Sequence, residues 1–339
     1  MRRFAAAAIC FAVGVALVWS SAPAYPQALK KIRITMPVVA LSMMPVYLAK
    51  ARGFLADEGL DVEMITTNGG GPDIKALIAG DVDFTYTPGD AVVLAYAAGQ
   101  RTIIVMSGFR RVIINWAMRR DVATARGITE STPFAQKIKA LKGLTIGATM
   151  PAALTANLAK YVIHEAGYVP QRDVAVIPIG SGQTWLAALE NHKVDAALTA
   201  TPVPEIAVAR GYAIMFINNS KGEDPSLPEF LMECLITRPD VIQKNSDLVS
   251  RMVRALVKAN KWALSSTPEQ VADALRPFLG GTPPNILLGG VKSSIPALSP
   301  DGRTTARAVQ ITEDGLQQAG VLEQRVPYPE LAVNSFIPK

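Results

Sequence analysis

The side chains of this 339-residue chain that could bind a ligand are small hydrogen-bond donors, grouped in six short loops. Each loop follows an apolar run, is rich in glycine, serine, threonine or asparagine, and contains no acid. Glycine lets a ligand approach the backbone, and hydroxyls add short donors. A ring of donors without an acid favours an anionic ligand. The candidate ligand residues in these loops are Ser42, Met43, Met44, Asn68, Gly69, Gly70, Thr85, Tyr86, Thr87, Thr149, Met150, Pro151, Ser181, Gly182, Thr199 and Thr201.

Two groups of side chains have two interpretations each. Arg110 follows an apolar run and could pair with a carboxylate or sulfonate, or it could be solvated beside Arg111. Met43, Met44 and Tyr86 could form an apolar wall for an organic ligand, or they could belong to the hydrophobic core. The sequence leaves both questions open.

Residues for catalysis or metal binding are scarce. His164 and His192 have no acid or cysteine at metal-ligand spacing, and neither a phosphate-binding GxxxxGK nor a GxSxG sequence occurs. Cys234 lies in the apolar run "FLMECLIT" and is expected to be a core thiol. We therefore expect a binding protein that is not an enzyme and has no cofactor and no metal.

The loops are positioned by alternating strands and helices of about ten residues, a pattern typical of βαβ units with a parallel sheet. Helices are opened by prolines and closed by glycines, as in "PDIKALIAG" at 72–80. Open α/β sheets place their ligands at the carboxyl ends of strands, which is where the six loops lie. Helices beginning at Pro72, Pro151 and Pro202 would direct backbone amides and a partial positive charge to the same place.

The strand-helix order occurs twice along the chain. "GDVDFTYTP" at 80–88 is echoed by "HKVDAALTATP" at 192–202, with Val82 and Val194 separated by 112 positions. "TMP" at 35 and 149 and "LAK" at 48 and 158 repeat at offsets of 114 and 110. We interpret the repeat as one supersecondary unit built twice, with a shared cleft between the copies.

The length and the repeat predict an α/β protein of two lobes, each a mostly parallel sheet flanked by helices. Residues 29–118 would form the first part of the first lobe, and residues 119–230 the second lobe, because the apolar pattern ends at Met118. Residues 231–339 would return to the first lobe and add C-terminal helices. The chain then crosses twice between the lobes, which makes a hinge.

The N-terminus has the layout of a secretory signal peptide over residues 1–24: Arg2 and Arg3, an apolar run from Phe4 to Val18, and small residues before the cleavage site. The alternative is an uncleaved anchor helix, but the run is shorter than the roughly 20 apolar residues a span requires. We therefore expect an exported, periplasmic protein.

The overall charge excludes one class of partner. The 34 basic and 28 acidic residues give a net charge of +6, which falls to +4 without Arg2 and Arg3. The basic residues are scattered and are not interleaved with aromatic residues, so we expect no nucleic-acid partner. We expect a monomer.

Residues 30–277 resemble the periplasmic substrate-binding proteins of the nitrate, taurine and alkanesulfonate transporters. The similar segments are "PVYLAKARGFLADEGLDVEMITTNGGGPDIKALIAGDVDFTYTPGDAVVLAYAAGQ", "LKGLTIGATM", "ALENHKVDAALTATPVPE" and "VRALVKANKWALSSTPE". The resemblance implies the two-lobed periplasmic-binding-protein fold (type II-like), with a cleft ligand that is delivered to a membrane permease driven by an ATP-binding cassette protein. It also implies ligand loops at 42–44, 68–70, 85–87, 149–151 and 199–201.

The predicted function is the solute-binding component of an ABC importer that captures a small organic anion, a sulfonate or a carboxylate, by closure of the lobes. Three alternatives remain open. A related branch makes the thiamine pyrimidine at a cysteine-rich iron site; the single cysteine left after signal cleavage excludes that chemistry, but binding of a pyrimidine or thiamine precursor stays possible. The others are a ligand-sensing partner of a membrane receptor and an exported enzyme on the same fold.

Overall fold

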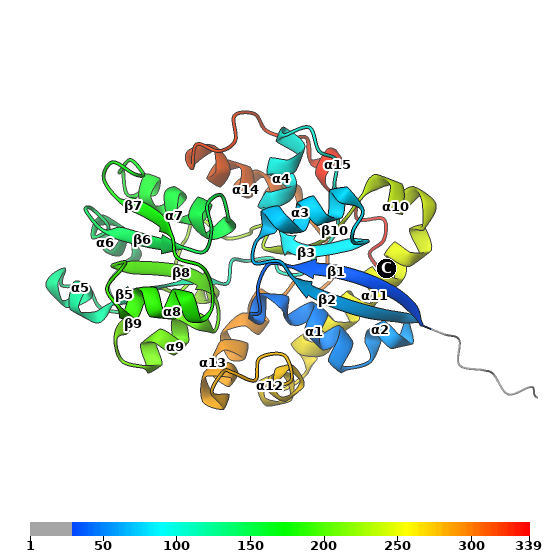
Figure 1. Ribbon diagram of the computed structural model, residues 1–339, viewed down its shortest axis with the longest axis horizontal. Coiled ribbons are helices and arrows are strands. Elements are labelled where there is room, and N and C mark those ends of the chain that lie inside the picture. The colour runs from blue at the N-terminus through cyan, green and yellow to red at the C-terminus, as the bar shows by residue number, and fades with distance from the viewer. Residues whose placement is uncertain (1–28) are drawn as a thin grey trace, which may run out of the picture.

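The computed structural model describes residues 29–339, which form two lobes, each built on a five-stranded sheet (Figure 1). The signal peptide predicted for residues 1–24 lies outside the described residues. Within residues 29–339, no helix combines the length and the apolar character that a membrane span requires. The predicted α/β fold with two lobes is confirmed.

The sheet of the first lobe has the strand order β2-β1-β3-β10-β4. Strands β1, β2 and β3 pair in parallel, and β10 is antiparallel to both β3 and β4. Four strands therefore share one direction and β10 runs against them. The elements are β1 (Lys30–Met36), η1 (Leu41–Met43), α1 (Met44–Ala51), α2 (Phe54–Asp57), β2 (Leu60–Thr66), α3 (Gly70–Ala79), β3 (Phe84–Pro88), α4 (Asp90–Ala97), β4 (Ile103–Ser107) and β10 (Glu233–Thr237).

The sheet of the second lobe has the equivalent order β7-β6-β8-β5-β9, with β5 reversed relative to β8 and β9. Its elements are β5 (Ile114–Arg119), α5 (Arg120–Ala125), α6 (Phe134–Lys139), β6 (Thr145–Ala148), α7 (Leu154–Glu165), β7 (Ala175–Pro178), α8 (Gln183–Glu190), β8 (Ala196–Ala200), α9 (Val203–Ala209), β9 (Ala213–Ile217) and η2 (Asn219–Lys221). Strands β3 and β8, which directly follow the repeated "VD" segment, take the same central place in the two sheets. The repeat in the sequence is thus a repeat in topology.

The reversed strand of each sheet is the one that the chain enters after crossing between the lobes. The first crossing joins β4 to β5, and the second joins β9 to β10. Strand β5 begins at Ile114, so the chain enters the second sheet before the boundary that the sequence placed near Arg119. The apolar pattern runs through the crossing because β4 and β5 are both almost wholly buried, and it therefore does not mark the change of lobe.

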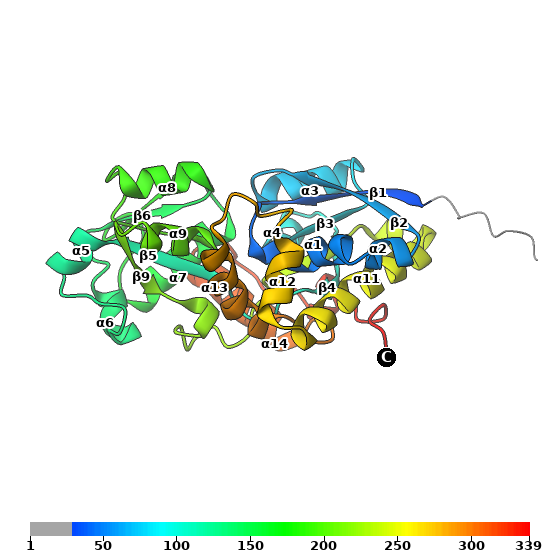
Figure 2. The ribbon, with the colours of Figure 1, turned by 90° about the horizontal axis from the view of Figure 1, so that it is seen from below.

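The C-terminal helices extend over the junction of the lobes (Figure 2). Helix α11 packs on α1 of the first lobe, whereas α13 contacts both η1 and α9, and α14 contacts both α4 and α7. Residues 231–339 therefore hold the two lobes together as well as completing the first sheet. These last elements are α10 (Pro239–Lys244), α11 (Ser246–Ser265), α12 (Pro268–Leu275), α13 (Pro284–Ser294), η3 (Ile295–Ala297), α14 (Ala306–Gln318) and α15 (Tyr328–Leu331).

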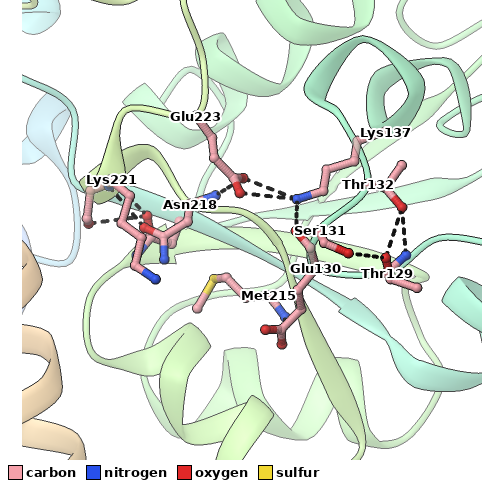
Figure 3. Close-up of polar contacts among 11 residues, drawn as sticks. Thr129, Glu130, Ser131, Thr132, Lys137, Met215, Asn218, Lys221 and Glu223 are labelled. Carbon is pink, nitrogen blue, oxygen red and sulfur yellow. Dashed lines mark hydrogen bonds and ion pairs between the residues drawn. The ribbon is translucent and has the colours of Figure 1, made fainter.

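The second lobe contains an ion pair between a buried lysine and a half-buried glutamate, neither of which lines the interlobe cavity (Figure 3). The Lys137 ammonium on α6 has only 1% of its side chain exposed and lies 3.2 Å from a carboxylate oxygen of Glu223. It also donates to the carbonyl oxygen of Glu130 at 2.8 Å, and Glu223 accepts from the backbone amide of Asn218 at 2.7 Å. The pair ties α6 to the segment that leads into the second crossing.

Candidate functional site

A cavity of about 60 Å³ lies between the lobes, at the carboxyl ends of the central strands. The first lobe contributes the starts of α3 and α4, and the second contributes the start of α7 and the end of β8. The repeated threonine-proline segments both face this region, since Pro88 lines the cavity and Thr199 and Ala200 line it from the other lobe.

The lobes touch around this cavity, so the structure represents a closed arrangement. The amide of Leu41 donates to the carbonyl oxygen of Thr201 at 3.0 Å. The Asn157 side chain on α7 donates to the Asp90 carboxylate on α4 at 3.0 Å. At Gly69, a Cβ atom would lie only 2.8 Å from the sulfur of Met150, so glycine lets the second lobe approach the loop before α3.

Two helix N-termini from opposite lobes meet at the cavity. The lining residues include Gly70 and Gly71 at the start of α3, a ten-residue helix, and Leu154 and Thr155 at the start of α7, which has twelve residues. The first amides of an α-helix have no acceptor within the helix, and the helix dipole adds partial positive charge there. The cavity is therefore provided with donors from both lobes.

Polar side chains supplement these amides. Thr149, Thr199 and Asn68 line the cavity. The Thr149 hydroxyl lies 2.8 Å from the Thr155 hydroxyl, and the Thr149 amide donates to the same oxygen at 3.0 Å. This local network fixes the loop that begins α7.

Two carboxyl groups also line the cavity, which overturns the expectation of an acid-free site. Asp90 is the first residue of α4, and Glu233 is the first residue of β10. Burial raises the pKa of Asp90 to about 6, because the charged form loses hydration. Burial also raises the pKa of Glu233 to about 8, with smaller contributions from the nearby carboxylates of Asp90 and Asp73. Glu233 is therefore mostly protonated at neutral pH.

A third buried acid, Asp73, lies on α3 behind the cavity. Burial raises its pKa to about 7, although the Thr67 hydroxyl donates to it at 2.6 Å. Among residues 29–339, neither Asp73 nor the two cavity acids forms an ion pair with a basic side chain. The first lobe thus holds a cluster of acids in low-dielectric surroundings.

The structure brings some of the candidate ligand residues to the cavity and places others elsewhere. The lining includes Asn68, Gly69, Gly70, Thr149 and Thr199. Thr87 lies directly behind it, since a Cβ atom at Gly70 would meet the Thr87 hydroxyl at 3.1 Å. The residues that do not line it are Ser42, Met43, Met44, Thr85, Tyr86, Thr87, Arg110, Met150, Pro151, Ser181, Gly182 and Thr201.

Different interactions occupy the residues outside the lining. Met43, Met44 and Tyr86 are fully buried in the core of the first lobe, so they are core residues and do not form a wall of the cavity. The Thr201 hydroxyl is engaged with Asn115 and Glu205, each at 3.1 Å. The remaining residues fall into two groups: Ser42 and Thr85 are buried in the first lobe, whereas Arg110, Pro151 and Gly182 are exposed and Ser181 is half-buried.

Sequence reasoning missed Asp90 and Glu233, although each had a visible signal. Asp90 follows Pro88 and Gly89 directly, so the predicted loop ended two residues too early. Glu233 is a lone acid inside the apolar run "FLMECLIT", and such an acid is rarely buried without a reason.

In the described part of the chain, few side chains are suited to metal binding or nucleophilic catalysis. Within residues 29–339, no group of three or more His, Cys, Asp or Glu side chains is arranged so that it could hold a metal ion. Cys234 is buried in β10, and burial raises the pKa of its thiol, so the thiolate is strongly disfavoured.

Comparisons with known proteins agree with this architecture. A model of the family described as NMT1/THI5 like matches residues 41–270. The protein YtlA of Bacillus subtilis (strain 168) is 21% identical over 311 residues, which are 90% of this chain and 88% of YtlA.

Two solved structures show the same fold. The ligand-binding component of an ABC-type import system from Staphylococcus aureus, with zinc bound, is similar with a TM-score of 0.73 and 13% identity, over 91% of this chain and 97% of that one. The alkanesulfonate-binding protein SsuA from Xanthomonas axonopodis pv. citri, bound to MOPS, has a TM-score of 0.69 and 18% identity, over 92% of this chain and 100% of that one. Because the family model matches more than half of its length, the chain belongs to the NMT1/THI5-like family.

Proposed function

We propose that this protein is an exported, periplasmic component of an ABC importer that captures a small organic anion, a sulfonate or a carboxylate, in the interlobe cavity. The observation that carries the proposal is the meeting of the N-termini of α3 and α7, one from each lobe, at a single closed cavity. An anion that accepts hydrogen bonds from both helices stabilises the closed arrangement over the open one. A membrane permease would then receive the closed, loaded form.

The two cavity carboxyls are compatible with an anion if they are not both charged. Glu233 has a pKa of about 8, so at pH 7 it carries a proton and can donate a hydrogen bond to an anion. Asp90 is already bonded to Asn157 of the other lobe, and we assign it to holding the lobes together. The sulfonate specificity of the SsuA relative supports the same ligand class.

The same carboxyls favour a second candidate, an aminopyrimidine. The amino group of the neutral ligand has two N–H donors, which would pair most strongly with ionised Glu233 and Asp90. The two candidates require opposite protonation states of Glu233, and they therefore predict opposite pH dependences.

The test is calorimetric titration of ethanesulfonate and of 4-aminopyrimidine between pH 6 and pH 9. An anion that accepts from the protonated carboxyl binds more weakly as the pH rises through about 8, and an aminopyrimidine that needs the carboxylate binds more tightly over the same interval. For the anion, Glu233→Gln keeps a donor, so its affinity is expected to stay within about threefold of the wild-type value at pH 7 and to lose most of its pH dependence.

The exposed Glu63 on β2 provides the matched control, since Glu63→Gln removes the same charge away from the cavity. Tighter binding of ethanesulfonate with rising pH, or binding of neither probe at millimolar concentration, would contradict the anion proposal. Stimulation of ATP hydrolysis in a permease complex by the loaded protein would support the transport role over a receptor-sensing role. Conversion of the bound ligand into a product would identify an exported enzyme instead.

A further inference from the structure

We propose that the surface groove between α3 and α4 is an apolar subsite of the ligand cavity, so that the ligand is amphipathic. Its polar head group would occupy the interlobe cavity, and an alkyl chain or aromatic ring would lie in the groove. This inference rests on the proposed function and specifies the ligand class of the same site.

The groove has the size and the lining of an apolar binding site. It measures about 540 Å³ and is lined mainly by Ile74 and Ile78 from α3 and by Leu94 and Ala95 from α4. The two helices lie side by side on one face of the first sheet (Figure 1). Ile78, with 36% of its surface exposed, is among the most exposed large hydrophobic side chains of residues 29–339.

The groove and the interlobe cavity adjoin. Both are lined by Gly71, Ala91 and Ala152, so only small residues from the two lobes separate them. A Cβ atom at Gly71 would meet no other atom within 4 Å, which shows that open space lies beside this backbone. At the preceding Gly70, by contrast, a Cβ atom would approach Thr87 and Ala91. Gly71 therefore marks the opening between the two spaces.

The dimensions favour a ligand that uses both spaces. Sites for small organic ligands usually enclose about 300–1,000 Å³. The interlobe cavity of about 60 Å³ is far smaller, whereas the groove of about 540 Å³ falls within this range. The cavity suits a compact polar head group, and the groove provides the apolar contact that the cavity lacks. Because the groove adjoins the cavity, we assign the groove to the apolar part of the same ligand.

The first experiment measures affinity along a series of 1-alkanesulfonates from methane- to octanesulfonate by calorimetry. Each methylene that enters the groove is expected to tighten binding by about two- to fourfold until the groove is filled. An affinity that does not change with chain length would overturn the subsite while leaving the proposed head-group site in place.

The second experiment makes the groove polar with Ile78→Asn. Ile78 lines the groove but not the interlobe cavity, and its side chain is exposed, so asparagine is expected to be tolerated in the fold. Binding of methanesulfonate should stay within about twofold of the wild-type value, and the gain from longer chains should be reduced, giving about fivefold weaker binding of octanesulfonate. Val169→Asn is the matched control, because Val169 is an exposed valine of the second lobe that does not line the groove. Retention of the full chain-length gain in Ile78→Asn would overturn the inference.

A neutral dye separates failure of this inference from failure of the proposed function. N-Phenyl-1-naphthylamine carries no acidic head group and reports apolar sites by its fluorescence. If the groove binds the dye, its fluorescence is enhanced. Ile78→Glu should remove this enhancement, and Val169→Glu, at an exposed valine of the second lobe, should not. If no sulfonate binds but the dye behaves in this way, the anion proposal fails and the apolar groove stands. If the dye shows no enhancement that depends on Ile78, the apolar subsite is overturned.

Discussion

The two lobes share a topology but differ in where their buried charged groups lie relative to the cavity. In the second lobe, the buried ammonium of Lys137 is paired with Glu223 and bonded to a backbone carbonyl. Burial also raises the pKa of Glu205 and of Asp224 in this lobe, but neither acid lines the cavity. In the first lobe, Asp73, Asp90 and Glu233 are buried with no basic partner among residues 29–339, and burial raises the pKa of each.

This difference separates charged groups that stabilise the fold from carboxyl groups that can change their protonation state when a ligand binds. A paired and hydrogen-bonded ion pair has a fixed protonation state and a fixed geometry. An unpaired buried carboxyl titrates near neutral pH and remains able to donate or accept, which is the property of a functional site. The titratable groups that line the cavity, Asp90 and Glu233, therefore belong to the first lobe, although the hydrogen-bond donors come from both lobes.

The largest expected effect comes from breaking the pair in the second lobe. Glu223→Gln leaves the Lys137 ammonium buried without a counter-charge, and we expect the free energy of unfolding at pH 7 to fall by about 4 kcal/mol. Urea unfolding followed by circular dichroism measures the change.

The control is Glu190→Gln, which removes a half-exposed carboxylate from a surface ion pair with Arg210 and is expected to change stability by less than about 1 kcal/mol. The double variant Lys137→Met with Glu223→Gln should recover most of the loss. Equal stability of Glu223→Gln and Glu190→Gln would show that the buried pair is not a stabilising feature of this lobe.

The next largest effect is a pH dependence in the first lobe. Because the pKa of Glu233 is raised from 4.5 to about 8, the folded protein binds more protons than the unfolded chain between these values. Stability therefore falls as the pH rises from about 5 to 8. Glu233→Gln removes this contribution, and we expect its stabilising effect to be about 3–4 kcal/mol larger at pH 8 than at pH 5. Thermal and urea unfolding at the two pH values test this prediction.

Glu63→Gln on the exposed edge of β2 is again the control, with no change expected at either pH. If Glu233→Gln destabilises the protein equally at pH 5 and pH 8, the carboxyl is held in its charged form and the contrast between the lobes disappears.

Much of the fold follows from local sequence features. Periodicity, prolines at helix starts and glycines at helix ends locate most elements, and the repeated "VD" segments locate the central strands β3 and β8. The placement of β5 does not follow in the same way, because the apolar run "VIINWAM" would suit either sheet. The contacts of α13 and α14 with both lobes depend on packing between distant segments, which no local pattern encodes.

The sequence predicts the parts of the candidate site that lie in loops directly after strands. The position of Asn68–Gly70 and of Thr149 follows from the rule that ligands bind at the carboxyl ends of strands. Glu233 comes from a strand 145 residues after Pro88, its partner in the ladder, so only the tertiary structure brings it to the cavity. In the sequence, Asp90 is explained equally well as an acid that stabilises a helix N-terminus, so its place in the cavity lining could not be recognised.

The smallest expected effect concerns the bond between the two lobes. The Asn157 side chain on α7 donates to the Asp90 carboxylate at 3.0 Å, and this contact exists only when the lobes are closed. In an open form both groups would be hydrated, so Asn157→Ala removes stabilisation from the closed form alone. We expect a loss of about 1.5 kcal/mol, which is about a tenfold weaker affinity for the ligand. The ligand-free variant should also have a larger radius of gyration in X-ray scattering if the closed form is populated without ligand.

Asn191→Ala is the matched control, because the Asn191 amide bonds only to the carbonyl oxygen of Ala187 on its own helix, far from the junction. The scattering measurement does not depend on the identity of the ligand, so it tests the role of the contact by itself. Asn157→Ala with both an unchanged affinity and an unchanged radius of gyration would mean that the acid of the first lobe does not respond to the second lobe. Asp90 would then be a structural residue like Glu223, and of the two cavity acids Glu233 alone would remain able to respond to a ligand.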